Sequence, residues 1–252
     1  MMKIDLNCDV GESFGRYILG EDPAVMPFIS SANIACGAHA GDPLVMQQTV
    51  RLALDHHVVI GAHPGYPDLQ GFGRRKISFD PEEVEAFILY QLGALSAFVQ
   101  IHGKKLRHIK PHGALYNQAS VDRTLAEAIS HADALFDQEL ILVGLPGSVL
   151  LEAGQRNGLR VAAEAFPDRG YLPDGSLMPR GLPGAILTDI EEITENALRL
   201  CREGIHVMVS GQETIFRVDT LCLHGDHPHA AENARRVREG LEEKHIKIQA
   251  LE

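Results

Sequence analysis

Strand-like and helix-like runs alternate along almost the whole chain, and this alternation limits what the chain can fold into more than any other feature. Seven short apolar runs are predicted to be strands, over residues 3–8, 32–36, 58–62, 106–110, 140–143, 160–165 and 220–223. Helical periodicity appears between them, for example at Val84, Ile88, Leu92 and Val99. Repeated strand–helix units imply a parallel sheet with right-handed crossovers.

Polar residues follow most of the strand-like runs. Four of the 13 histidines stand in short glycine-containing segments just after such a run, namely His39, His63, His112 and His224. The first run ends in a similar way, in Asp9-Val10-Gly11-Glu12. A barrel aims side chains from several strand ends at one point, whereas an open sheet gathers its ligand contacts near one switch point. We therefore expect a closed or nearly closed α/β barrel, with an open doubly wound sheet as the alternative.

The chain has 252 residues, of which 45% are apolar, and this suffices for the core of one barrel. We expect a single domain over residues 1–252, with about seven parallel strands. One segment departs from the repeat, because residues 207–218 are typical of a β-hairpin, so a hairpin is predicted near 205–218. Helix starts are indicated at Asp42, Asp80 and Asp226, each followed by proline, and at a capping box that begins with Thr188.

Composition excludes several classes of protein. The formal net charge is −11, and no basic cluster is long enough to follow a phosphate backbone, which argues against nucleic acid as a partner. The first residues lack the apolar stretch of a signal peptide, and no window approaches the roughly 20 apolar residues of a membrane span. We expect a soluble, cytoplasmic protein. The four cysteines form no Cys-x-x-Cys pair, which predicts buried thiols rather than a zinc knuckle.

The residues at the first three strand exits are candidates for catalysis. Asp9 and Glu12 can share a metal ion or act as an acid/base pair. His39 and His63 follow neighbouring strands in matching contexts, so both imidazoles can face one mouth. Neutral imidazole with carboxylate suits a catalytic divalent metal, for which Asp9, His39 and His63 are the candidate ligands. Histidine is equally a metal-free general base, and the sequence leaves both readings open.

Lys110 and His112 follow the fourth predicted strand. A lysine at the end of a buried strand is costly unless it is paired or functional. We expect Lys110 to act as an electrophile and His112 as an acid or base. The alternative is a lysine paired with Asp or Glu across the barrel.

Further residues are candidates for binding the substrate. Glu164, Asp168 and Arg169 leave the sixth strand, and Arg169 can grip a carboxylate with Asp168 orienting it. The glycine-rich segment 65–76, which contains Arg74, suits a lid that binds an anion, but a solvated loop or a docking surface is equally consistent with it. His224, at the last strand exit, is also assigned to the site. The chain has neither a phosphate-binding loop nor a Gly-x-Ser-x-Gly elbow.

Seven blocks in this order resemble the LamB/YcsF family. They are 5–12, 33–42 (which adds Asn33 to the candidate substrate-binding residues), 61–68, 71–75, 110–116, 164–169 and 219–226. The resemblance implies an irregular (β/α) barrel of the glycoside hydrolase/deacetylase type. It also implies ATP-dependent opening of the lactam of 5-oxo-L-proline (pyroglutamate) to L-glutamate, with ATP as co-substrate, in a complex with subunits B and C.

Two alternatives remain beside this interpretation. One is a self-sufficient, metal-dependent amidohydrolase or polysaccharide deacetylase. The other is a non-catalytic subunit that binds the substrate while the chemistry happens elsewhere. Whether the chain also forms a homo-oligomer is left open.

Overall fold

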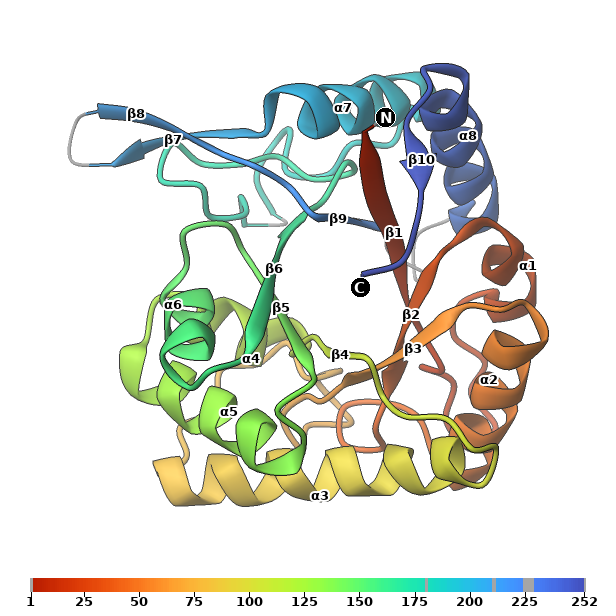
Figure 1. Ribbon diagram of the computed structural model, residues 1–252, viewed down its shortest axis with the longest axis vertical. Helices are drawn as coiled ribbons and strands as arrows, with labels where there is room; N and C mark the ends of the chain where they lie inside the picture. The colour runs from red at the N-terminus through yellow and green to blue at the C-terminus, as the bar shows by residue number, and fades with distance from the viewer. Residues whose placement is uncertain (1, 180, 210–211, 224–228, 252) are drawn as a thin grey trace.

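Among the residues that the computed structural model describes (2–179, 181–209, 212–223 and 229–251), seven parallel strands close into a barrel (Figure 1). Strand β9 pairs with both β6 and β1, which closes the sheet. The predicted barrel is confirmed, and the open sheet is excluded. The strands are β1 (Lys3–Val10), β2 (Ser31–Ala35), β3 (Val59–His63), β4 (His108–Ile109), β5 (Ile141–Gly144), β6 (Arg160–Ala165) and β9 (Thr220–Leu223). A short β10 (Lys247–Ile248) pairs with the start of β1.

Helices surround the barrel (Figure 1). They are α1 (Asp22–Val25), the 3₁₀ helix η1 (Met26–Phe28), α2 (Pro43–Asp55), α3 (Pro81–Gln100), α4 (Gly113–Ala119), α5 (Arg123–Phe136), α6 (Val149–Arg156), α7 (Ile190–Glu203) and α8 (Ala230–Glu243). The predicted cap Asp42 accepts hydrogen bonds from the backbone N–H groups of Leu44 and Val45. At α7 the prediction was wrong by one residue, because Asp189 caps the helix instead of Thr188. The start expected at Asp226 lies outside the described residues.

The predicted hairpin is also present. It consists of β7 (Ile205–Val209) and β8 (Gln212–Phe216), which pair antiparallel and project from the barrel (Figure 1). Gly204 ends α7 with a φ of 77° and turns the chain into β7. The hairpin therefore stands between α7 and β9, where the regular repeat would place a strand of the barrel.

The two faces of β1 show how the barrel is filled. Ile4, Leu6 and Cys8 point outward into the hydrophobic core. The alternate residues Asp5 and Asn7 point inward, as the period of a strand requires. Asn7 Nδ2 donates to the side chains of Glu164 on β6 (3.0 Å) and Thr220 on β9 (2.6 Å). A barrel of this kind is ordinarily filled with branched apolar side chains, so this polar interior is unusual.

The polar interior forms layers below the site. Asp5 accepts hydrogen bonds from Ser31 (2.6 Å) and Thr220 (2.5 Å) at the lower level. Burial raises the pKa of Asp5, although these hydroxyl donors act in the opposite direction. One level higher, Asn33 Nδ2 donates to Asn7 Oδ1 at 2.7 Å. Partners are therefore provided layer by layer for polar groups that would otherwise be costly to bury.

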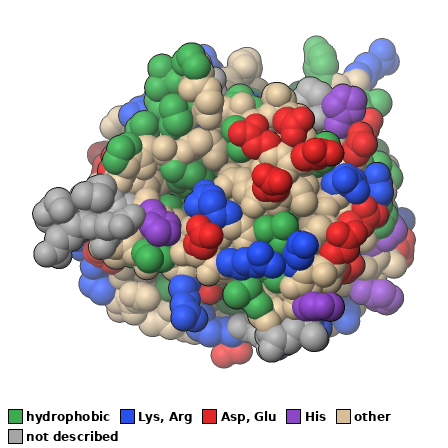
Figure 2. All heavy atoms as spheres, turned by 90° about the horizontal axis from the view of Figure 1, so that it is seen from above, with side chains coloured by type: hydrophobic (Ala, Val, Ile, Leu, Met, Phe, Trp, Pro, Cys, Tyr) green, Lys and Arg blue, Asp and Glu red, His purple; other side chains and the backbone are tan. Residues whose placement is uncertain are grey.

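The outer surface is charged and mixed. Seen from the side on which α7 and α8 lie, acidic and basic side chains are interspersed (Figure 2). Ion pairs along α8 join Arg235 to Glu239 and Arg238 to Glu242. Such exposed pairs each contribute only about 0.3–0.5 kcal/mol. No helix in the described part of the chain has the length and hydropathy needed to cross a membrane.

Candidate functional site

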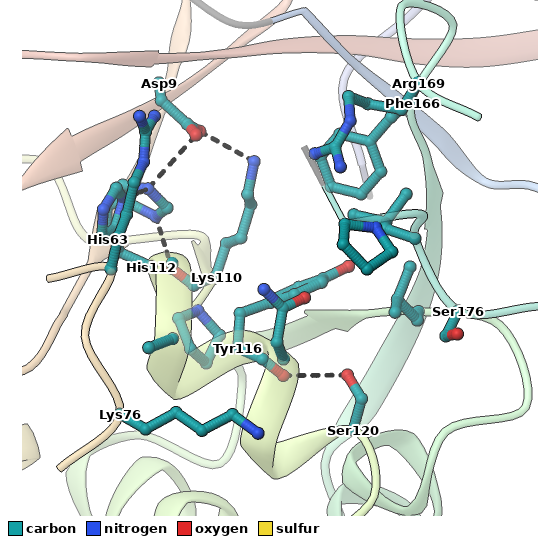
Figure 3. A pocket seen from close by; sticks show the side chains of 18 of the residues that line it. Asp9, His63, Lys76, Lys110, His112, Tyr116, Ser120, Phe166, Arg169 and Ser176 are labelled. Atoms are coloured by element: carbon teal, nitrogen blue, oxygen red, sulfur yellow. Dashed lines mark hydrogen bonds and ion pairs between the residues drawn. The ribbon is translucent and has the colours of Figure 1, made fainter. Parts of the chain in front are cut away.

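A cavity of about 490 Å³ opens at the carboxyl ends of the barrel strands. Asp9, Glu12, His63, Lys110 and His112 line it. Figure 3 shows His63 between Asp9 and His112, with Lys110 reaching the same aspartate. The structure thus gathers at one rim the six residues predicted to be catalytic, since His39 packs directly on His112. The volume lies in the range of ordinary small-molecule pockets.

Lys110 is the central cation of the site and is only 3% exposed. Its Nζ lies 2.7 Å from Asp9 Oδ1 and 3.1 Å from Glu164 Oε1. Burial alone would lower the pKa of Lys110, but Asp9, then Cys222 and Glu164, outweigh burial and hold it well above the ordinary value. The lysine is therefore paired across the barrel, as one of our two interpretations predicted, and it also lines the cavity.

Asp9 is held from below and faces the cavity. Asn33 Nδ2 donates to Asp9 Oδ1 at 2.8 Å, beside the ammonium group of Lys110. The other carboxylate oxygen, Oδ2, lies 3.3 Å from His63 Nε2. Asn33 itself lies beneath Asp9 and is not among the residues that line the cavity. Its position therefore suits orientation of Asp9 rather than direct contact with a substrate.

Three buried histidines form a cluster beside Asp9. His63 Nδ1 lies 2.6 Å from the carbonyl oxygen of Lys110, and His63 Nε2 lies 2.9 Å from His112 Nδ1. His39 stacks on His112 with ring centroids 3.7 Å apart and an interplanar angle of 2°. Burial, reinforced by the neighbouring imidazoles, lowers the pKa of His112 to about 3 and that of His39 well below its ordinary value. His39 and His112 are therefore neutral imidazoles at physiological pH.

Glu12 completes the cluster. Its Oε1 lies 3.4 Å from His39 Nε2 and 3.6 Å from His112 Nδ1. One donor atom each from Glu12, His39, His63 and His112 lie within 4.8 Å of one another. Glu12 is thus the carboxylate that lies close to all three imidazoles. Asp9 contacts His63 and also forms the ion pair with Lys110.

The glycine-rich segment 65–76 packs against the histidines. Gly73 has a φ of 62°, and a Cβ there would lie 2.8 Å from His39 Cβ and 2.9 Å from His112 Cδ2. The carbonyl oxygen of Phe72 lies 2.8 Å from His112 Nε2. Arg75 forms a bidentate ion pair with the buried Asp68 and thereby fixes the loop. The loop is therefore a wall of the site.

Arg74 and Arg169 both line the cavity. Arg74 is exposed and lies over the ring of Phe72, 4.9 Å from its centroid. Arg169 is buried, and it donates from Nε to the carbonyl of Ala185 (2.9 Å) and from Nη2 to that of Met178 (2.6 Å). Figure 3 shows Arg169 across the cavity from His63.

The remaining predicted substrate-binding residues lie elsewhere. Asp168 is buried beside Arg169 but is not among the residues that line the cavity. Glu164 lies inside the barrel, where it contacts Lys110 and Asn7. His224 lies outside the described residues.

Several residues of the site were not predicted from the sequence. His108 was taken as an ordinary histidine, which was wrong: it is buried inside the barrel, and its Nε2 lies 2.7 Å from Asn33 Oδ1. Its position two residues before Lys110, within the predicted strand 106–110, was the available signal. Tyr116 and Phe166 line the cavity with aromatic surface. Both stand beside predicted site residues, but nothing in their local spacing marks them as pocket residues.

Comparison with known proteins agrees with the resemblance seen in the sequence. The LamB/YcsF family model matches residues 4–252. A protein from Syntrophobacter fumaroxidans, named as the A subunit of 5-oxoprolinase, is 51% identical over 250 residues, covering 99% of each chain. A protein of the same name from Thermus thermophilus is 52% identical over 250 residues, covering 99% of this chain and 100% of its own.

Solved structures extend the comparison. The crystal structure of a lactam utilization protein from Thermus thermophilus superposes with a TM-score of 0.92 at 51% identity, covering 99% of this chain and 100% of that one. A family 4 carbohydrate esterase from Streptomyces lividans reaches a TM-score of 0.50 at 10% identity, covering 100% of this chain and 93% of that one. At that identity the likeness concerns the fold alone, and it confirms the deacetylase-like barrel.

Proposed function

The chain belongs to the LamB/YcsF family, and from that membership we propose that it serves as a subunit of a 5-oxoprolinase, which opens the lactam of 5-oxo-L-proline to L-glutamate. The observation that carries the proposal is the buried Asp9–Lys110 pair at the floor of the cavity, next to three histidines. Burying so many polar groups at a strand exit is costly, and a catalytic site accounts for that cost.

Ring opening sets clear requirements. The oxygen of water adds to the lactam carbonyl, the ring C–N bond breaks, and the ring nitrogen gains a proton as it becomes the amine of glutamate. The amide is unreactive, so the site must accept a proton from water and stabilise the negative charge that develops on the carbonyl oxygen.

We assign to Asp9 the role of accepting that proton. Lys110 and Asn33 both donate to Oδ1, and this orients Oδ2 toward His63 at the cavity wall. Lys110 then acts chiefly as a positioning residue, because its single positive charge is shared by two carboxylates. This differs from the electrophilic role that we expected from its place in the sequence.

Other cations are available to hold the substrate. Arg74, Lys76 and Arg169 line the cavity, while Tyr116 and Phe166 supply apolar surface for a five-membered ring. A guanidinium group pairs with a carboxylate through two parallel hydrogen bonds. We assign the carboxylate of 5-oxo-L-proline to Arg74 or Arg169, both of which line the cavity.

ATP and partner subunits belong to the same proposal. The sequence lacks a phosphate-binding loop. We propose that subunits B and C complete the site and supply part of the nucleotide chemistry, so that ring opening is coupled to ATP hydrolysis.

Reconstitution tests this function. The chain is combined with candidate B and C subunits, and ATP-dependent release of glutamate from 5-oxo-L-proline is measured. Asp9→Asn is expected to lower kcat by about 100-fold or more, and His63→Ala to abolish turnover, with circular dichroism unchanged. The matched control Asp55→Asn, at the exposed end of α2, should keep full turnover.

Three outcomes would contradict the proposal. Full turnover with Asp9→Asn and His63→Ala would remove both residues from the chemistry. Undiminished turnover when Asp9, His39 and His112 are replaced together would favour a non-catalytic binding subunit. Activity of the chain alone, with metal and without ATP, would favour the self-sufficient amidohydrolase.

A further inference from the structure

The protons on two of the clustered histidines are fixed by their backbone partners. A carbonyl oxygen can only accept a hydrogen bond, so His63 Nδ1 carries the proton that it donates to Lys110 O at 2.6 Å. For the same reason His112 Nε2 carries the proton that it donates to Phe72 O at 2.8 Å. With one proton on each ring, His63 Nε2 and His112 Nδ1 each present a lone pair.

These two lone pairs face each other. His63 Nε2 and His112 Nδ1 are 2.9 Å apart, a distance at which two acceptors repel unless a cation lies with them. His63 Nε2 also lies 3.3 Å from a carboxylate oxygen of Asp9. With these protons assigned, His63 Nε2, His112 Nδ1 and the Asp9 oxygen are three hydrogen-bond acceptors that lie side by side without a donor between them.

His39 and Glu12 extend the same set of donors. His39 is fully buried, and neither of its ring nitrogens has a hydrogen-bond partner within the described part of the chain. Its Nε2 lies 3.4 Å from Glu12 Oε1, which in turn lies 3.6 Å from His112 Nδ1. A buried imidazole without a hydrogen bond is costly, and a ligand at this point would remove the cost.

We propose that Glu12, His39, His63 and His112 bind one divalent transition-metal ion of the Zn²⁺ and Co²⁺ class. The three measured separations between their donor atoms are 2.9, 3.4 and 3.6 Å. Ligands at about 2.0–2.1 Å around a tetrahedral ion are roughly 3.3 Å apart, so the separations suit one ion. The rings of His39 and His112 are stacked in parallel, and one of them must turn so that both nitrogens point at the ion. Three nitrogen donors select such an ion over Mg²⁺ or Ca²⁺, which prefer oxygen ligands.

The surroundings of the cluster resemble the outer layer of a metal site. Metal-binding histidines ordinarily donate their second N–H to a carbonyl or carboxylate, which His63 and His112 both do. The backbone of Gly73 closes over His39 and His112, where a side chain would not fit. A proton shared by His63 and His112 is the competing occupant of this position.

The metal site is tested by titration of the full-length chain, first stripped of metal with a chelator. Co²⁺ is added and its visible absorption recorded, and Zn²⁺ binding is measured by calorimetry. We expect one ion per chain with a dissociation constant in the micromolar range or below. Glu12→Gln and His112→Gln should each weaken binding at least about 10–100-fold and change the Co²⁺ spectrum. His131→Gln, at an exposed histidine of α5, is the matched control and should bind as the parent does.

The proposal fails if the stripped chain binds neither ion at one per chain, or if both substitutions leave the Co²⁺ spectrum and affinity unchanged. It also fails if nitrogen chemical shifts reveal a proton held between His63 and His112 that added Zn²⁺ does not displace. Glu12→Gln keeps the shape of the side chain, so it gives a folded variant if His112→Gln does not. Binding is read without turnover, so a chain that binds Co²⁺ at these residues but releases no glutamate would overturn the proposed function and leave the metal site standing.

Discussion

The Nζ of Lys110 lies 2.7 Å from Oδ1 of Asp9, although 101 positions of sequence separate the two residues. This pair ties the end of β4 to β1 through the inside of the barrel. Asn33, Glu164 and Cys222 surround it on the barrel side, and both members face the cavity on the other. Replacing one member leaves the other charge buried without its partner.

Lys110→Met is therefore expected to lower the free energy of unfolding by about 3–5 kcal/mol. The loss arises because Asp9 and Glu164 would remain buried together without the ammonium group between them. Urea unfolding followed by circular dichroism measures it. Lys105→Met removes an exposed lysine paired with Asp137 at 3.5 Å and should cost under about 1 kcal/mol. Equal stabilities of the two variants would show that the buried pair does not contribute.

We predict that position 61 must be glycine, because His108 occupies the space that a side chain there would need. A Cβ at Gly61 would overlap the imidazole ring of His108, on the neighbouring strand inside the barrel. Gly61→Ala should cost about 1–3 kcal/mol, measured by urea unfolding, and much less when His108 is also Ala. Gly93→Ala, in α3 with open space around it, should instead stabilise by roughly 0.5–1 kcal/mol. Strict additivity of the double variant would refute the steric explanation.

Asp133 on α5 is expected to destabilise the protein as pH rises. Its side chain is fully buried, neither carboxyl oxygen has a hydrogen-bond partner among the described residues, and burial raises its pKa well above 3.8. Between the unfolded and folded pKa values, the folded state holds one proton more than the unfolded state. The free energy of unfolding therefore falls by about 1.4 kcal/mol per pH unit over that range.

Asp133→Asn removes this titration. The variant should gain stability over the parent from pH 4 upward, with a margin that grows as pH rises, measured by urea unfolding at several pH values. Asp55→Asn, at an exposed aspartate, serves as the control. If the difference in free energy of unfolding between the variant and the parent does not change with pH, Asp133 is ionised in the folded protein.

Arg74→Gln should separate substrate binding from chemistry. Arg74 is an exposed cation that lines the cavity, so its loss is expected to raise KM for 5-oxo-L-proline about tenfold or more with a smaller effect on kcat. Steady-state kinetics of the reconstituted enzyme provide both values. Arg156→Gln on α6, which removes an exposed pair with Glu127, should change neither. A fall in kcat at unchanged KM would move Arg74 from binding to the chemical step.

Much of the fold could be predicted because its signals are local. The periods of strands and helices, proline after an N-cap aspartate, and the alternation that predicted the hairpin are all local patterns that short segments of sequence contain. The error at the start of α7 was also local: Thr188 and Asp189 are both good caps, and the final choice depends on how the preceding chain reaches the helix.

The site was predictable at its rim but not below it. Strand exits marked Asp9, His63 and His112 because each stands in a short polar segment with a glycine after an apolar run. The sequence could not show that Lys110 takes Asp9 and Glu164 as partners while Glu12 approaches the imidazoles of His39 and His112. That choice depends on the stagger of the barrel strands, which sets the level at which residues from different strands meet.

The pairing of β1 with β9 also has a consequence for synthesis. Asp5 and Thr220 are hydrogen-bonded at 215 positions of separation, so one seam of the barrel joins β1 to a strand that is synthesised much later. A ribosome must therefore translate past β9 before the barrel can close, and until then Asp5 lacks its partner Thr220. Contacts at such long range form slowly, which places completion of the cavity among the last events of folding.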